Sequence, residues 1–379
     1  MNLLNKTTPW VVASLLVATS AFGQSKCPPA QKSFEQGNEL SANQMMAAYN
    51  APARIDVRGA WDFYASASFI YWQPSQDNMM IAVTNSSQAV PAAGTISPID
   101  GNVINQNFKF KPGFKVGLGM NFDHDNWDVF TEYTWFHAGS MSNSSNAKVN
   151  GSLFASRAHP NTNSTNIFTS ASGSWKVNMD FLDMELARAS YVGTSLTFRP
   201  FFGARAAWIR QRAVSTYTNA SITTGTAVRG TLQVTENVRS WGIGPRAGLY
   251  TNWLLGQGFR FYGNGFLDLL YTHYGKANHF SNWTVLNAST STGAHIRGGG
   301  DSNTNGIRTH IDLEFGFGWG TYFDNSNWHV DLLLGYGFQV FFDQNQFRHF
   351  ESVTAPGVHT EPNGNMYIQG LTTTLRFDF

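Results

Sequence analysis

Short segments of this chain alternate strictly between apolar and polar residues, and this alternation limits what the chain can fold into more than any other feature. One face of each segment is apolar, and the other carries polar residues or glycine. Clear examples are residues 61–72, 114–122, 311–320, 329–341 and 371–379. Successive side chains of a β-strand point to opposite sides, so a repeat of two residues is typical of strands with one face against an apolar phase. We therefore expect an all-β protein.

No helical membrane span is predicted, because no run of about 18 apolar residues follows the first 23 residues. Charged residues make up only 13% of the chain, whereas aromatic residues make up 15%. Ordinary globular domains contain about 25% charged residues. The chain therefore has too little charge for the surface of an ordinary soluble protein of this size.

Short and long connections alternate between the strand segments. The short ones include 122–127, 191–195, 254–258 and 323–328. The long ones are rich in Asn, Ser, Thr and Gly and cover roughly 74–107, 138–174, 211–236, 274–306 and 343–363. Short periplasmic turns and long outer loops are typical of a transmembrane β-barrel. We expect an antiparallel up-and-down barrel of about ten strands (range 10–16), with residues 79–84 and 230–238 as extensions of strands or an extra hairpin.

A soluble β-sandwich or barrel would also alternate, with its apolar faces turned inward. Glycine on the opposite face, as at Gly316, Gly318, Gly335 and Gly337, is an unusual choice for strands exposed to water. Tryptophans at strand ends suggest the aromatic girdles of a membrane protein. These are Trp127, Trp135, Trp175, Trp208, Trp241, Trp253 and Trp328. Both features favour the membrane barrel.

The first 23 residues have the composition of a secretory signal peptide, with Lys6 before an apolar core and small residues at the end. Ala21 and Gly23 occupy the positions that predict cleavage between Gly23 and Gln24. Residues 24–55 are then a periplasmic N-terminal segment, with a plug inside the barrel as the alternative, and residues 56–379 form the barrel. Cys27 is the only cysteine, so no disulfide can form within one chain.

The last strand has apolar residues at alternate positions and ends on an aromatic residue. Leu371, Leu375, Phe377 and Phe379 form its apolar set. This ending resembles the signal by which outer-membrane barrels are recognised by their assembly machinery. We expect these four residues to face lipid, while Thr372, Thr374 and Arg376 face the lumen.

Two further segments carry a family resemblance. Residues 181–212 read "FLDMELARASYVGTSLTFRPFFGARAAWIRQR", and residues 241–249 read "WGIGPRAGL". They resemble the central hairpin of the Legionella-type major outer membrane protein family, which is pore-forming and has chlamydial major outer membrane protein-like relatives. The resemblance implies a pore-forming barrel in the outer membrane of a Gram-negative bacterium. The lone Cys27 departs from cysteine-rich chlamydial proteins and makes a disulfide-linked network impossible.

With the apolar faces outward, the charged residues of the strands become candidates for the pore lining. They are Lys115, Asp128, Glu132, Asp183, Glu185, Arg199, Arg205, Arg246, Arg260, Asp268, Asp312, Glu314, Asp331 and Arg376. Two outcomes stay open: the charges line a water-filled channel with a weak cation preference, or they pair and close a narrow barrel. We expect porin-like passage of small hydrophilic solutes or ions. The alternative is a structural or surface-exposed, adhesin-like barrel without a significant channel.

No pattern in the sequence indicates an enzyme, a metal site or a cofactor. His310 and Asp312 share one face of a predicted strand, but neither a nucleophile signature nor a carboxylate dyad accompanies them. The net charge of +1 gives no reason to expect nucleic acid as a partner. The expected partners are outer-membrane lipid and the outer-membrane assembly machinery. A homo-oligomer, and contacts of the outer loops with host cells or phage, stay open.

Overall fold

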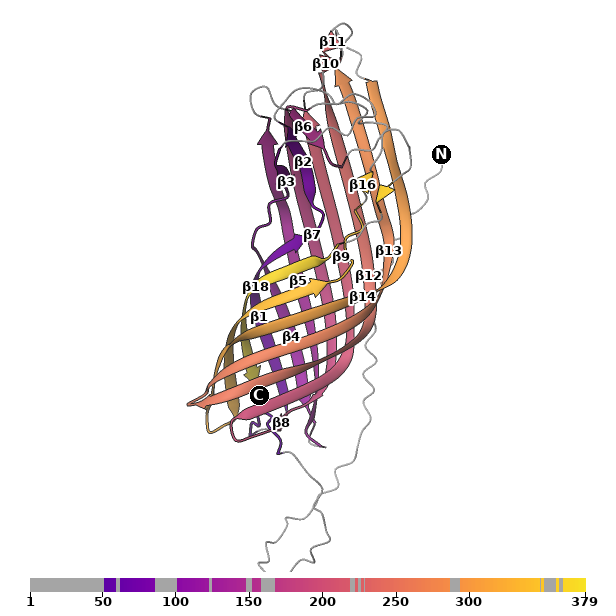
Figure 1. The fold of residues 1–379 in the computed structure, drawn as a ribbon. Coiled ribbons are helices and arrows are strands. Elements are labelled where there is room, and N and C mark those ends of the chain that lie inside the picture. Colours follow the sequence, from indigo (N-terminus) through magenta and orange to yellow (C-terminus); the bar gives the residue numbers. More distant parts are fainter. Residues whose placement is uncertain are drawn as a thin grey trace, which may run out of the picture. The chain divides into compact units, whose positions relative to one another are not determined.

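The computed structural model describes residues 51–58, 62–85, 101–122, 125–147, 152–157, 168–218, 222–223, 226–227, 229–286, 294–347, 349–350, 359–360 and 364–379. The predicted signal peptide, Cys27 and most of the predicted N-terminal segment lie outside these residues. Within them, ten long antiparallel strands form one closed barrel (Figure 1). In ring order they are β1 (Phe63–Gln76), β4 (Lys111–Asn121), β5 (Trp127–Asn146), β7 (Ser170–Arg188), β9 (Leu196–Thr218), β12 (Arg229–Gly256), β13 (Phe259–Leu286), β14 (Ala294–Phe323), β15 (Trp328–Phe341) and β18 (Met366–Asp378). The predicted architecture and strand number are confirmed.

The last strand closes the barrel against the first. β18 pairs with β1 from Asp378 opposite Tyr64 to Met366 opposite Gln76. The backbone groups of Phe63 and Phe379 exchange two hydrogen bonds, of 3.2 and 3.0 Å. Closure satisfies the backbone N–H and C=O groups that the paired stretches of both strands turn toward each other, so neither strand presents an open sheet edge there.

Tight turns join the strands at one end of the barrel, which we call the short-turn end. Asp125 and Asn126, and likewise Asp324 and Asn325, have positive φ angles, which suits hairpin turns. Gly258 also has a positive φ, of 82°, and a Cβ built there would lie 2.2 Å from the carbonyl oxygen of Gly320. Only glycine fits that turn.

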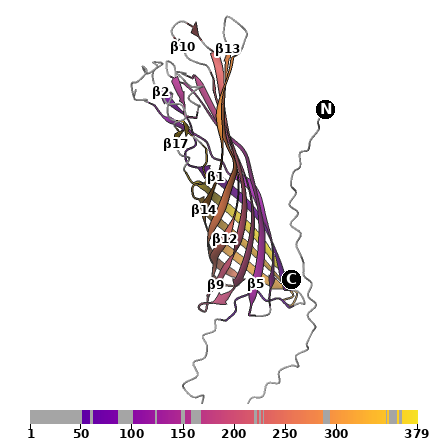
Figure 2. The same cartoon turned by 90° about the vertical axis from the view of Figure 1, so that its right-hand side faces the viewer.

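At the other end, several strands continue far beyond the expected barrel (Figures 1 and 2). β9 and β12 stay paired up to Thr218 opposite Thr231, and β13 and β14 up to Val285 opposite Ala294. Much of the predicted outer loops at 138–174, 211–236 and 274–306 is therefore strand, and residues 230–238 belong to β12. The composition of these stretches is polar because their outward faces are polar, which made paired strands look like loops.

A small sheet packs at this extended end. It consists of β3 (Val103–Asn105), β2 (Met80–Asn85) and β6 (Ser152–Ala155). Most of the predicted segment 79–84 is therefore β2, which does not extend β1 but pairs antiparallel with β3 and β6. Ile81 and Leu153 pack against Tyr217, Leu232 and other residues of the extended strands. The remaining short strands are β8 (Ser190–Tyr191), β10 (Ile222–Thr223), β11 (Thr226–Ala227), β16 (His349–Phe350) and β17 (His359–Thr360). The described residues include no helix long and apolar enough to cross a membrane.

The strands β7, β9 and β12 have opposite polarity in their two halves, which meet near the level of Trp208 and Trp241. In the half toward the short turns, the short-turn half, apolar side chains point outward: Met184 and Phe202 are 55% and 57% exposed. In the other half, the extended half, apolar side chains point inward and are buried. Trp175 belongs to this buried interior, so its prediction as a girdle residue was wrong.

Candidate functional site

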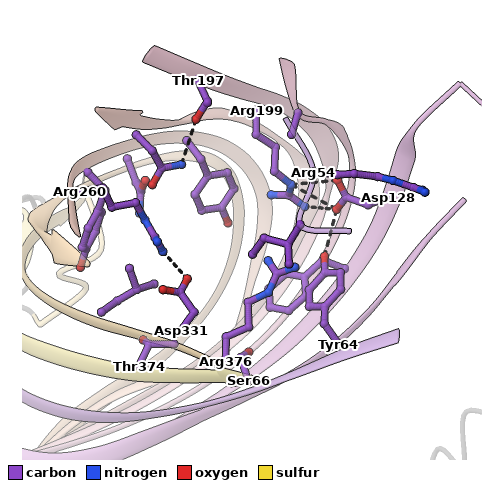
Figure 3. A pocket seen from close by; sticks show the side chains of 18 of the residues that line it. Arg54, Tyr64, Ser66, Asp128, Thr197, Arg199, Arg260, Asp331, Thr374 and Arg376 are labelled. Carbon is purple, nitrogen blue, oxygen red and sulfur yellow. Dashed lines mark hydrogen bonds and ion pairs between the residues drawn. The ribbon is translucent and has the colours of Figure 1, made fainter. Parts of the chain in front are cut away.

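A cavity of about 360 Å³ lies inside the short-turn half. Its lining comes from most of the barrel strands, because alternate residues of each strand point inward. Asp128, Arg199 and Tyr64 gather on one wall, and Arg260 and Asp331 lie across the cavity (Figure 3). We call this cavity the vestibule.

Residues 51–58, which we call the strap, connect distant turns at the short-turn end. The backbone N–H of Ala53 donates to the carbonyl of Ala189 (3.1 Å), in the turn between β7 and β9. The N–H of Arg58 donates to the carbonyl of Ser326 (2.8 Å), in the turn between β14 and β15. The hairpin of β12 and β13 lies between these two turns in ring order. Ala53, Arg54 and Ile55 also line the vestibule, so the strap borders it from the short-turn end.

Ion pairs and tyrosine hydroxyls organise one wall of the vestibule. Nε of Arg199 donates to Oδ2 of Asp128 at 3.0 Å, and Arg199 also contacts Glu185 at 3.4 Å. The hydroxyl of Tyr64 donates to Asp128 at 3.0 Å, and that of Tyr250 donates to Glu185 at 3.0 Å. Tyr64 and Arg199 share Oδ1 of Asp128, and Tyr250 and Arg199 share Oε2 of Glu185, so the tyrosines help to fix the geometry of the charged groups.

Three more ion pairs complete the lining. Lys115 contacts Glu132 at 3.1 Å, Arg376 contacts Asp378 at 2.6 Å, and Arg260 pairs with Asp331. The described lining carries six cationic side chains and four carboxylates. Glu185 and Asp378 pair with two of the cations. The charges around the vestibule are therefore nearly balanced.

A buried layer of charges separates the vestibule from the extended half. Arg205 donates two hydrogen bonds to Asp183, at 2.6 and 2.7 Å, and a third to Asp268 at 2.9 Å. Arg246 donates to both oxygens of Asp268 at 3.0 Å. Nδ1 of His310 lies 2.5 Å from the same carboxylate. All five side chains are at most 4% exposed. We call these residues the ion-pair layer.

Aromatic rings cover the ion-pair layer on the side of the extended half. The Phe181 ring lies 5.1 Å from the guanidinium of Arg205, and the Phe341 ring lies 3.9 Å from the ring of His310. Phe181 and Phe341 stack on each other at 5.6 Å. Trp175, Met179 and other buried apolar residues continue this packing through the extended half. The interior in this conformation is therefore polar in the short-turn half and mainly apolar in the extended half, where Arg157, Glu236 and His279 form a buried charged cluster.

The structure brings the predicted charged residues together in two groups. Asp183, Arg205, Arg246 and Asp268 lie in the ion-pair layer, and Asp312 is buried on the inward face of β14. The others lie around the vestibule: Lys115, Asp128, Glu132, Glu185, Arg199, Arg260, Glu314, Asp331 and Arg376. Sequence reasoning missed Tyr64, Tyr250 and Asp378 as partners. Their positions on the inward face of predicted strands could have indicated them. His310, considered above with Asp312, instead contacts Asp268.

No group of three or more His, Cys, Asp or Glu residues that could hold a metal ion occurs among the described residues.

The four predicted residues of the last strand turn outward: Leu371, Leu375 and Phe379 are 38%, 52% and 38% exposed, and the Phe377 ring packs near that of Trp328. The opposite face of the strand contributes Thr372, Thr374 and Arg376 to the vestibule.

A family model described as Legionella pneumophila major outer membrane protein precursor matches residues 56–379. The chain belongs to this family. It is thus an outer-membrane β-barrel of a Gram-negative bacterium, and the short-turn end is the periplasmic end. The outward apolar face of the short-turn half is the lipid-facing band. The extended half lies beyond the membrane on the outer side.

Other comparisons give weaker likenesses. The crystal structure of the Pseudomonas putida toluene transporter TodX aligns with a TM-score of 0.32 and 9% identity, over 84% of this chain and 89% of that one. A major outer membrane protein from Thermus thermophilus aligns with a TM-score of 0.24 and 10% identity, over 85% and 100%. The CymD monoaromatic hydrocarbon channel gives 0.29 and 10%, over 84% and 89%. These scores are too low to carry any conclusion about function. No curated protein matches the chain.

Proposed function

We propose that this protein is an outer-membrane channel for small hydrophilic solutes or ions, and that the conformation described here is its closed state. One observation carries the proposal. Within the lipid-facing band, many charged and polar side chains of the inward face surround a cavity at the periplasmic end.

The extended half gives a comparison, because its interior is mainly apolar and its buried charges are confined to Arg157, Glu236 and His279 among the described residues. Trp175, Met179 and Phe181 close that half with apolar contacts. Replacing buried ion pairs by apolar residues of similar volume is often neutral or stabilising. Charges that only filled the short-turn half would therefore bring no advantage in stability. A path for water and polar solutes gives them a role.

Opening requires movement at the boundary between the two halves. Phe181 and Phe341 cover the ion-pair layer and form an apolar constriction directly above it. Apolar constrictions stop ions by excluding water, and they conduct when they widen. The balanced charges around the vestibule favour neither cations nor anions, so we expect weak selectivity.

Planar-bilayer recordings of refolded protein test the proposal. We expect brief, small conductance steps from the wild-type protein and more frequent or larger steps from a Phe181→Ala, Phe341→Ala double variant. A Phe315→Ala, Phe317→Ala variant is the matched control, because both rings face outward and are 58% exposed. That control should conduct like the wild type. Absence of conductance from both the wild type and the Phe181→Ala, Phe341→Ala variant, with both folded, would contradict the proposal.

The second candidate is a structural barrel without passage. It is favoured by the complete burial of Asp268 and His310 in the ion-pair layer. Under this alternative, removing the two rings lowers stability and leaves the membrane without any conductance. The same recordings therefore decide between the two functions.

A further inference from the structure

Five basic side chains point outward from neighbouring strands, just beyond the lipid-facing band. Lys176 lies on β7, Arg210 and Arg212 on β9, Arg239 on β12 and Lys276 on β13, and all five are exposed. These residues are called the basic patch below. They come from separate stretches of the sequence, so only the pairing of the strands reveals the cluster.

The strand register places the five residues in two adjacent rows. Lys176 is opposite Arg212 in one row. Arg239 is opposite both Arg210 and Lys276 in the next row. Neighbouring strands lie about 4.8 Å apart, so the patch is about 15 Å wide across four strands.

The height of the patch relative to the membrane follows from two tryptophans. Trp208 and Trp241 are opposite each other, two residues from Arg210 and Arg239 on their strands. Both project outward and are 43% and 44% exposed, and Tyr271 on β13 lies beside Trp241. Exposed tryptophan and tyrosine at this level are typical of the membrane–water interface. The basic patch therefore lies at the level of the headgroups of the outer leaflet.

Little of this positive charge is neutralised within the protein. Asp180 pairs with Arg210 at 2.7 Å, and it also accepts from Tyr133. The other four basic residues make no ion pair within the described part of the chain. The remaining outward residues of these strands beyond the tryptophans are almost all Ser, Thr, Asn and Gln. Like charges on neighbouring strands repel each other, so an anionic partner would stabilise this arrangement.

We propose that the basic patch binds the phosphate groups of lipopolysaccharide, the phosphorylated glycolipid of the outer leaflet. The patch continues the lipid-facing band directly, so a lipid whose acyl chains pack below Trp208 presents its headgroup at the patch. Arginine binds phosphate in a bidentate manner, and clusters of basic residues at a membrane surface recruit anionic lipid. The partner is thus a lipid held beside the barrel, independent of any solute inside it.

The experiment measures binding of purified lipopolysaccharide to refolded full-length protein in non-ionic detergent. A variant with Lys176→Gln, Arg212→Gln, Arg239→Gln and Lys276→Gln removes the four unpaired charges. We expect its affinity to fall by about tenfold or more, since each basic residue near an anionic surface contributes substantially. The wild type should also bind dephosphorylated lipopolysaccharide only weakly, and its binding should weaken with added salt.

A charge-preserving variant is the matched control: Lys176→Arg, Arg212→Lys, Arg239→Lys and Lys276→Arg. It should keep at least most of the wild-type affinity, and heat-modifiable migration on gels checks that both variants are folded. Equal binding of phosphorylated lipopolysaccharide by the wild type and the glutamine variant would overturn the proposal. So would equal binding of the phosphorylated and dephosphorylated lipid by the wild type.

Discussion

The two halves of β7 use the same alternation in opposite senses. In the short-turn half, Leu182 and Met184 point outward while Asp183 and Glu185 point inward. In the extended half, Lys176 and Asn178 point outward, and Trp175 and Val177 are buried inside. β9 and β12 change in the same way beyond Trp208 and Trp241. An alternating strand therefore does not reveal which face is inside until the surrounding medium is known.

This difference separates two ways of holding a barrel together. The outward apolar residues of the short-turn half are in contact with lipid, so the interior of that half can be polar. The extended half has water outside, so it needs an apolar core like any soluble β-protein. The change between the two marks the outer surface of the membrane on the strands themselves. Each substitution below affects one half, with a control in the other half or on the other face.

The largest effect is expected from removing a charge inside the ion-pair layer. Arg205→Met leaves Asp183 and Asp268 with fewer cationic partners in a buried site, and breaking such a pair costs about 3–5 kcal/mol. Arg210→Met is the control on the same strand, because the Arg210 side chain is 52% exposed and pairs with Asp180 on the outside. Its loss should cost at most about 1 kcal/mol. Equilibrium unfolding in urea with lipid vesicles measures both, and equal losses would contradict the layered interior.

A somewhat smaller effect is expected from a charge on the lipid-facing band. Ala247 points outward between Trp241 and Trp253 on β12, so Ala247→Arg should lower the free energy of unfolding by about 2–4 kcal/mol. Gln233 has the same outward orientation on the same strand, in the extended half. Gln233→Arg should change stability by no more than about 0.5 kcal/mol. If both variants lost the same stability in vesicles, the two halves would not face different media.

The smallest effect on stability is expected at the end of the chain. Phe379→Ser removes apolar surface from the lipid-facing band, where full burial of such a side chain contributes about 1.5–3 kcal/mol, and Phe379 is only partly buried. We also expect slower assembly in cells, seen as less heat-modifiable protein in the outer membrane. Phe379→Leu should restore part of this yield. Val214→Ser, outward in the extended half, should leave it unchanged. Normal assembly of the serine variant would refute the role of the last residue.

Much of the short-turn half was predictable from the sequence. Alternation at 311–320, 329–341 and 371–379 identified the outward faces, because lipid imposes one apolar face on every strand. The same logic placed Asp183, Arg205 and Asp268 on inward faces. The pairing among them was not predictable, because it depends on how far neighbouring strands are shifted along each other in the closed barrel.

The extended half was missed, although its signal is present in the sequence. Around residue 181, the apolar positions change from odd numbers (Trp175, Val177, Met179) to even numbers (Leu182, Met184). The adjacent apolar pair Phe181 and Leu182 marks the change. If the outward-facing positions are assumed to stay the same along the whole strand, the first part of β7 is predicted as a polar loop. Trp175 is then predicted to belong to an aromatic girdle. Following the phase along each strand would have located both the core and the membrane boundary.

The central claim is that β7, β9 and β12 pass from lipid into water at one level, while their inward faces change from mainly polar to mainly apolar. Spin labels on the outward face of β7 test it directly, at Lys176, Asn178, Leu182 and Met184, each replaced by cysteine in a Cys27→Ser background in lipid vesicles. We predict that labels at 182 and 184 collide mainly with dissolved oxygen, as in lipid. Labels at 176 and 178 should collide mainly with a water-soluble nickel chelate. The same preference at all four positions would contradict the account.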